Sequence, residues 1–150
     1  MTKRRGISPV IATVIIVAVT IAVAIAVAFW MTGIVGLFTA AEKLEITYAY
    51  ANPTQAGWDV TLSVRNTGTT TTSIDMVIIN GVQAGSTGCG GAALGTTLPL
   101  TLNPGGEGTI TITINRDGTC GPTTFKSGVS IEVKLHSTGG KEYPKLLVLP

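Results

Sequence analysis

Residues 7–41 read ISPVIATVIIVAVTIAVAIAVAFWMTGIVGLFTAA, a run of 35 residues without a charge between Arg5 and Glu42. As an α-helix, 35 residues extend about 52 Å, whereas the hydrocarbon core of a bilayer is about 30 Å thick. Large and small residues alternate at the centre of the run. Both sets are apolar, however, and a lone strand in lipid leaves its backbone polar groups unpaired. The run therefore predicts one hydrophobic helix, longer than membrane anchoring requires.

The small residues of this helix are arranged in stripes. Ala18, Ala22 and Ala26 recur every four residues and share one helical face, and Ala24 and Ala28 form a second, shorter stripe. Small side chains let helices approach closely, and in lipid such packing is a main source of helix association. The pattern predicts a helix that packs against copies of itself, with these five alanines at the contacts.

From Glu42 onward the chain changes to short runs in which apolar and polar residues alternate. Such runs occupy residues 44–50, 58–65, 74–79, 110–114 and 129–136, with weaker candidates at 94–102 and 143–149. In the third run, the predicted apolar face consists of Ile74, Met76 and Ile78. Turn residues such as Asn80-Gly81 separate the runs. About seven strands at this spacing predict an α+β protein, in which an immunoglobulin-like antiparallel β-sandwich head follows the hydrophobic helix.

Charge and composition argue against several classes of function. Three of the ten basic residues lie in the first five positions, and the rest of the chain has seven basic and eight acidic side chains. No basic patch for nucleic acid is left. His136 falls on the polar face of a predicted strand as a lone surface histidine, and no catalytic triad, phosphate loop or metal-ligand spacing is present in the sequence. We expect no enzyme activity, no cofactor and no metal.

The residues before the hydrophobic run form a leader with a recognisable pattern. Lys3, Arg4 and Arg5 precede Gly6, and the apolar run then opens with Ile7 and the residues SPVI. This start closely resembles that of archaeal type IV prepilins. Basic residues hold such an end on the cytoplasmic side of the membrane. Bacterial type IV pilins carry Glu as the fifth mature residue, where this chain has Ile11, so the resemblance is to the archaeal branch.

The resemblance implies a division of the chain and a set of partners. A prepilin peptidase would cut between Gly6 and Ile7, removing residues 1–6 and leaving residues 7–41 as the helix and residues 42–150 as an extracellular head. The precursor would lie in the membrane until a pilus assembly ATPase and its membrane platform polymerised it into a cell-surface filament used for adhesion. The alternatives are an archaellin of a rotary motility filament, and a monomeric membrane-anchored binding module that keeps its leader.

Two further expectations follow if the head is extracellular. Cys89 and Cys120 both lie in glycine-rich surroundings, and outside the cell a disulfide between them is the natural pairing. The head is poor in charge, and a cluster of hydroxyls is a candidate site for O-linked sugars, which would supply solubility. The cluster consists of Thr67, Thr69, Thr70, Thr71, Thr72 and Ser73.

Overall fold

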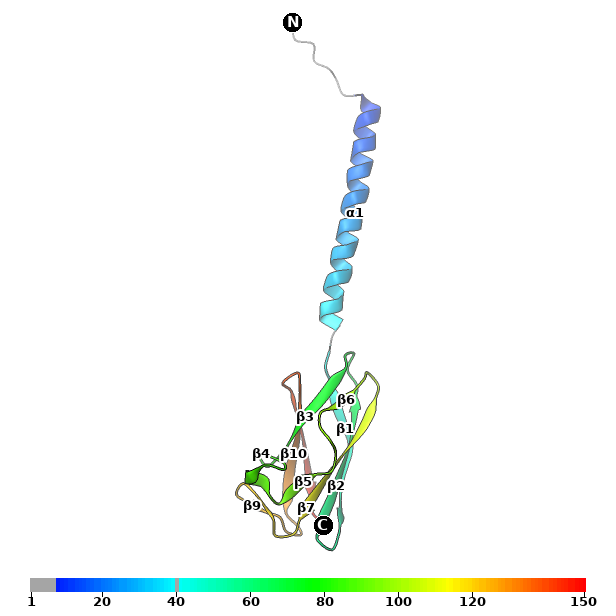
Figure 1. Cartoon of the computed structure of the whole chain (residues 1–150). Helices are drawn as coiled ribbons and strands as arrows, with labels where there is room; N and C mark the ends of the chain where they lie inside the picture. Colours follow the sequence, from blue (N-terminus) through cyan, green and yellow to red (C-terminus); the bar gives the residue numbers. More distant parts are fainter. Residues whose placement is uncertain (1–7, 40) are drawn as a thin grey trace. The chain divides into compact units, whose positions relative to one another are not determined.

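The computed structural model describes residues 8–39 and 41–150, so the predicted leader residues Lys3, Arg4, Arg5, Gly6 and Ile7 lie outside the described part of the chain. The chain divides into two units, residues 1–40 and residues 41–150. The first contains one helix, α1 (Pro9–Thr39), and the second contains eleven strands (Figure 1). The predicted α+β organisation, with an apolar helix followed by an antiparallel β-sandwich head, is confirmed.

Helix α1 is 31 residues long, or about 46 Å at 1.5 Å per residue. It begins at Pro9, where the missing N–H has no helical partner to lose, and the first bond across the turn runs from Ala12 N to Ser8 O at 3.2 Å. The helix continues through Gly33 and Gly36 without interruption. Glycine costs only about 1 kcal/mol relative to alanine in a helix interior, which the surrounding strong helix pattern tolerates.

Residues 41–43 belong to the head, although we predicted that the helix would extend to Ala41. The loop after the second strand pairs with this segment: Thr69 N donates to Ala41 O at 2.8 Å, and Ala41 N donates to Thr69 Oγ1 at 2.9 Å. Gly68 N donates to Lys43 O at 3.0 Å, and a side chain at Gly68 would collide with Ala41 O. Because these bonds fix the backbone of Ala41 in the head, α1 ends before it.

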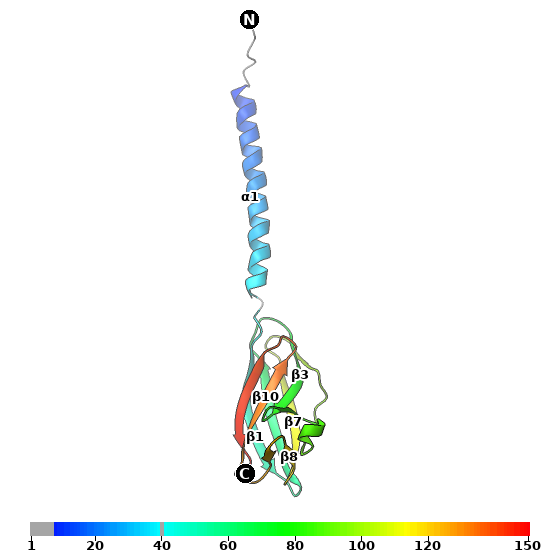
Figure 2. The ribbon, with the colours of Figure 1, turned by 90° about the vertical axis from the view of Figure 1, so that its left-hand side faces the viewer.

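Two antiparallel sheets form the head. The first has the order β1 (Leu44–Pro53), β2 (Gly57–Asn66), β7 (Glu107–Asn115) and β5 (Ala92–Leu94). The second has the order β11 (Glu142–Val148), β10 (Ser130–Ser137), β3 (Thr72–Ile79) and β4 (Val82–Gln83), and β6 (Leu100–Leu102) also pairs with β3. A small hairpin, β8 (Thr119–Cys120) and β9 (Thr123–Thr124), and a 3-10 turn, η1 (Thr87–Cys89), complete it. The edge strands β1 and β11 lie beside each other (Figure 2).

The core lies between the two sheets and consists of head residues. Strict alternation places Trp58, Val60, Leu62 and Val64 of β2 fully inside, and the facing positions of β7 and β10 are likewise buried: Ile110, Ile112, Ile114, Ile131, Val133 and Leu135. Phe125 and Leu149, which lie outside these strands, are also fully buried. The predicted inward faces of these three strands are therefore confirmed.

The predicted apolar face of β3 is wrong beyond its first residue. Ile74, Val77 and Ile79 are buried in the core, whereas Met76 and Ile78 are half-buried on the opposite face. The pairing with β10 shifts register here, because His136 faces Met76 and the next residue, Ser137, faces Ile74. One extra residue in a strand moves every following side chain to the other face of the sheet, so the bulge changes which apolar set is buried.

Candidate assembly surfaces

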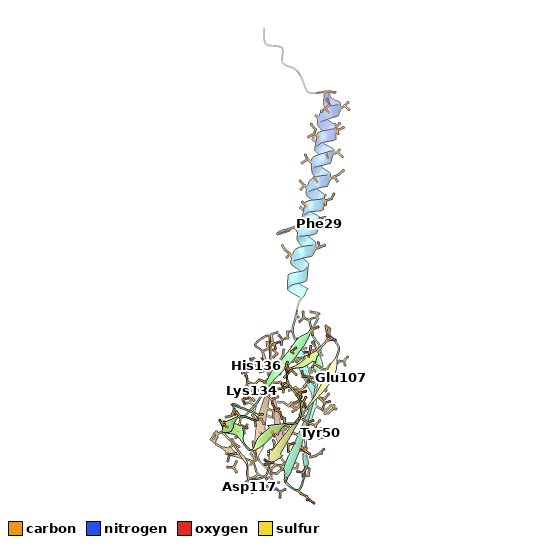
Figure 3. The ribbon with its side chains drawn as sticks, viewed as in Figure 1. Phe29, Tyr50, Glu107, Asp117, Lys134 and His136 are labelled. Carbon is orange, nitrogen blue, oxygen red and sulfur yellow. A yellow bond between two sulfur atoms is a disulfide. The ribbon has the colours of Figure 1, made fainter. Side chains whose placement is uncertain are left out.

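The surface of α1 is apolar along its described length. Fourteen large apolar side chains between Val10 and Met31 are exposed, Phe29 at 76% and Trp30 at 67%. In Figure 3 these side chains project around the helix. The segment Pro9–Ile34 is long and apolar enough to cross a membrane, and it is the one such segment among residues 8–39 and 41–150. A surface of this kind is stable in lipid or against other apolar helices, not in water.

The hydroxyl groups within this apolar surface are satisfied by the helix itself. Thr13 Oγ1 donates to Val10 O at 2.8 Å, and Thr20 Oγ1 donates to Ile16 O at 2.6 Å. Thr32 Oγ1 lies 3.1 Å from Ala28 O and 3.0 Å from Phe29 O. An unpaired hydroxyl is costly in an apolar medium, and back-bonding to the preceding turn removes that cost. The helix can therefore change from one apolar environment to another without losing hydrogen bonds.

The five alanines predicted at helix contacts are all exposed on α1. At 100° per residue, Ala18, Ala22 and Ala26 lie on one side of the helix, and Ala24 and Ala28 lie on nearly the opposite side. Two stripes on opposite sides would allow close approach by two neighbouring helices. Whether these alanines make such contacts remains a prediction.

A hollow interrupts the surface of α1 near its middle. It has a volume of about 200 Å³ and is lined by Ile25, Ala28, Phe29 and Thr32. These residues occupy positions i, i+3, i+4 and i+7, the four that form a hole for one side chain of a facing helix in knobs-into-holes packing. Ala28 leaves the space, and the longer side chains of Ile25 and Phe29 form its rim. An open hollow of this kind can receive a side chain of a neighbouring helix or part of a lipid chain.

The predicted disulfide is present in the head. Cys89 at the end of η1 and Cys120 in β8 are bonded, and both are fully buried. The surrounding glycines have a steric reason, because a Cβ on Gly91 would lie 2.6 Å from the backbone of Gly118. Gly91 N donates to Thr119 O at 3.1 Å, so the two segments also pair directly. The disulfide therefore joins two backbones that are already in contact.

The hydroxyl cluster predicted as a sugar attachment site is divided by the fold. Thr67, Thr69 and Thr71 are exposed and Thr70 and Ser73 are half-buried. Thr72 is 4% exposed, and its hydroxyl has no hydrogen-bond partner. An enzyme that attaches sugars cannot reach this side chain in the folded head, so Thr72 is removed from the candidates. The other five positions remain predictions.

His136 is not the isolated surface side chain that we expected. Its Nδ1 lies 2.7 Å from Asp75 Oδ1 on the outer face of the second sheet, where the bulge in β3 brings the carboxylate to it. The two residues are 61 positions apart, and no short motif indicated the contact. Within the described residues, no group of three or more His, Cys, Asp or Glu side chains is placed to hold a metal ion.

Two pairs of exposed apolar side chains in the head were also not predicted from the sequence. Tyr48 and Tyr50 stack on the outer face of β1, with ring centroids 5.9 Å apart. Leu146 and Val148 lie on the outer face of β11. Exposed aromatic and aliphatic side chains are typical of protein–protein contacts when they gather in one place.

Comparison with known proteins gives a distant likeness to solved structures. No protein-family model matches the chain, and no curated protein matches it. It is similar to a structure of the archaellum periplasmic stator protein complex FlaF and FlaG from Sulfolobus acidocaldarius, with 20% identity over 69% of this chain and 87% of that chain, and a TM-score of 0.46. It is similar at the same identity to archaellum periplasmic stator protein FlaG from that organism, over 71% of this chain and 100% of that chain, with a TM-score of 0.45.

Proposed function

We propose that the chain is the precursor of a structural subunit of an archaeal type IV pilus, polymerising through its N-terminal helix into a cell-surface filament used for adhesion. The resemblance of its first residues to archaeal prepilins supports cleavage between Gly6 and Ile7 by a prepilin peptidase. An assembly ATPase and its membrane platform would then move the subunit from the bilayer into the filament. On this proposal the protein has no catalytic activity of its own.

The observation that carries the proposal is the apolar surface of α1, on which Thr13, Thr20 and Thr32 bond back to the helix. Burying one large apolar side chain is worth about 1.5–3 kcal/mol. Fourteen such side chains on α1 are exposed, and together they correspond to about 20 kcal/mol or more. The head closes its core with its own residues, so this surface is free to associate with lipid or with other copies of the helix.

Features of α1 that suit close helix packing favour the filament. The hollow at Ile25, Ala28, Phe29 and Thr32 has the geometry of a helix–helix contact. The alanine stripes on two sides would allow each helix to have more than one close neighbour.

A membrane-anchored binding module is the second candidate, and the length of the apolar surface favours it. Pro9–Ile34 has 26 residues and would extend about 39 Å as a helix, close to the thickness of a bilayer with its interfaces. In this arrangement the leader stays attached and α1 remains in the membrane. An archaellin of a rotary filament is a third arrangement, with the same helix bundle and a different motor.

Mass spectrometry of filaments sheared from cells tests the proposal. We expect the subunit to begin at Ile7 and to retain the Cys89–Cys120 disulfide. A Gly6→Leu variant should stay in the membrane fraction as uncut precursor and give no filaments, whereas Arg4→Lys, which keeps the charge of the leader, should assemble normally. A lone, detergent-soluble native protein that still carries residues 1–6 would refute the filament and support the membrane-anchored module.

A further inference from the structure

The sheet edges of the head leave rows of backbone groups outside the two ladders. An edge strand offers its N–H and C=O groups to any other strand, so it is a template for pairing with another chain. The outer strands are β1 and β5 in the first sheet and β11 and β4 in the second, where β6 also pairs with β3. β5 and β6 have three residues each and β4 has two, and edges this short give little purchase to a second chain. The long edges are β1 and β11, with ten and seven residues.

The hydrogen-bond register shows which residues of β11 face its free edge. Just beyond the two ends of this strand, Ser137 N donates to Lys141 O at 2.9 Å and Leu149 N donates to Val129 O at 3.0 Å. The register between these pairs has no shift, and in an antiparallel pair every second residue bonds to the partner strand. The odd-numbered residues of β11 therefore bond to β10, and the backbone of the even-numbered residues points away. Pro144 is one of the latter, so its missing N–H removes a donor from the free edge.

Strand β1 has a proline in the equivalent position. Just beyond its end, Thr54 N donates to Gly57 O at 2.8 Å, so the even-numbered residues after the bulge bond to β2 and the odd-numbered residues face the free edge. Pro53 is one of the odd-numbered residues and has no N–H to offer. The bulge between Ile46 and Tyr48 interrupts the regular edge further along the strand. Both long edges therefore lack a donor where a partner strand would need one.

Lys145 is a second obstacle on β11. It pairs with Val133, which is fully buried, so its half-buried side chain lies on the core-side face of the sheet at the edge. An inward-pointing charge in an edge strand keeps its contact with water only while the edge is open. Lys145 has no ion pair with any residue of 41–150. A strand added to β11 would therefore bury an ammonium group without a partner, which is strongly unfavourable.

We propose that Pro53, Pro144 and Lys145 prevent the head from joining its sheets to a strand of another chain. The strands met most often belong to other copies, because a filament and a membrane both hold neighbouring heads at high effective concentration. With the long edges blocked and the other edges short, copies of the chain associate without merging their sheets. This role goes beyond the proposed filament and applies equally to a membrane-anchored module.

A Pro144→Val and Lys145→Val double variant of the full-length chain, purified in detergent, tests the proposal. The double variant restores the edge donor and removes the charge, and valine is favoured in strands, so the head should fold. Sedimentable multimers that bind thioflavin T should form about tenfold faster than in wild type. The matched control is Pro104→Val with Lys126→Val, which makes the same changes at exposed positions outside the strands. This control should stay within about twofold of wild type.

Hydrogen exchange identifies the edge that pairs. In the wild-type chain, the amides of Leu146 and Val148 should exchange faster than that of Leu147, which bonds to β10. In the multimers of the double variant, these two amides should become as protected as Leu147. Equal protection of all three amides in wild type would overturn the proposal, because the edge would already be covered. Multimers that leave Leu146 and Val148 unprotected would also overturn it, as would a double variant that forms multimers no faster than the control.

Pro53→Val tests the other long edge in the same assay. This variant should also form multimers faster than the control, with new protection at the amides of Ala49 and Ala51, and a rate equal to that of the control would remove Pro53 from the proposal. None of these measurements requires a filament. A wild-type chain that never forms filaments would therefore overturn the proposed function and leave the blocked edges standing.

Discussion

Removal of the Asn66 side chain should loosen the loop that holds residues 41–43. Asn66 is fully buried, and its Nδ2 donates to Thr70 O at 2.8 Å and to Leu102 O at 2.9 Å, while its Oδ1 accepts from Gly68 N at 2.9 Å. Each bond has a net worth of about 0.5–1.5 kcal/mol, and an orphaned buried carbonyl costs about 1–3 kcal/mol. We therefore expect Asn66→Ala to destabilise the head by about 2–4 kcal/mol.

Asn66→Asp changes the hydrogen bonds of the side chain while keeping its volume. A carboxylate keeps the shape and can accept from Gly68 N, but it cannot donate to the carbonyl oxygens of Thr70 and Leu102. We expect Asn66→Asp to destabilise the head more than Asn66→Ala does at neutral pH. Burial and the two carbonyls should raise its pKa in the folded state, so the Asp variant should lose stability as pH rises above the unfolded value of about 3.9.

Urea unfolding of residues 41–150, followed by the fluorescence of Trp58, measures these effects. Trp58 is fully buried and is the single tryptophan of this unit. Thr71→Ala is the matched control, because it removes one exposed hydrogen bond, to Asn103 Oδ1 at 3.2 Å, and should change stability by about 0.5 kcal/mol or less. If Asn66→Ala lies as close to wild type as this control, or if Asp at neutral pH is as stable as Ala, the assigned hydrogen bonds do not hold the loop.

Three further predictions concern the head. Replacing both Cys89 and Cys120 by Ala, which opens a link across 31 positions, should lower the free energy of unfolding by about 3–4 kcal/mol, measurable in urea with and without reductant. Gly91→Ala should destabilise by more than about 1 kcal/mol because its Cβ would meet backbone at 2.6 Å, whereas Gly90→Ala, with φ −65° and open space, should be neutral or stabilising in the same thermal melts. Burial is the main cause that raises the pKa of Tyr143 above its ordinary 10.0. The neutral phenol therefore stabilises the head below pH 10, and that contribution is lost as pH rises further. Tyr143→Phe should weaken the dependence of the unfolding free energy on pH above 10, and an unchanged pH profile would contradict this.

Strict periodicity made most of the sandwich predictable. In β2, β7 and β10 the apolar set recurs every second residue over five or more positions, so one face is specified without knowledge of the partner strands. The β3 face failed because both alternating sets contain apolar residues after Asp75, and the bulge that decides between them depends on the pairing with β10. The two-residue strands β4, β8 and β9 are too short to have a period.

The assembly surfaces were predictable to different degrees for a related reason. The apolar surface of α1 could be predicted from its own segment, because an uncharged apolar run of this length forms a helix in lipid whatever its neighbours are. The outward pair of β11, Leu146 and Val148, is not decided by its own segment. Residues 146–149 are Leu-Leu-Val-Leu, and the sequence does not reveal which pair faces outward. The pairing of Leu147 with Ile131 decides it, since both then face the core and Leu146 and Val148 are left outside.

The division into two units makes the stability of the head separable from the association of the helix. The head closes its core with its own residues and pairs residues 41–43 through Thr69 and Gly68, while the hydroxyls of α1 bond within the helix. Moving α1 from lipid to a bundle therefore breaks no hydrogen bond described in either unit. Effects at distant sites without shared partners add independently. Asn66 variants should thus lower the unfolding temperature of the head without changing helix association. A substitution that fills the hollow at Ala28 should change helix association without changing the unfolding temperature of the head.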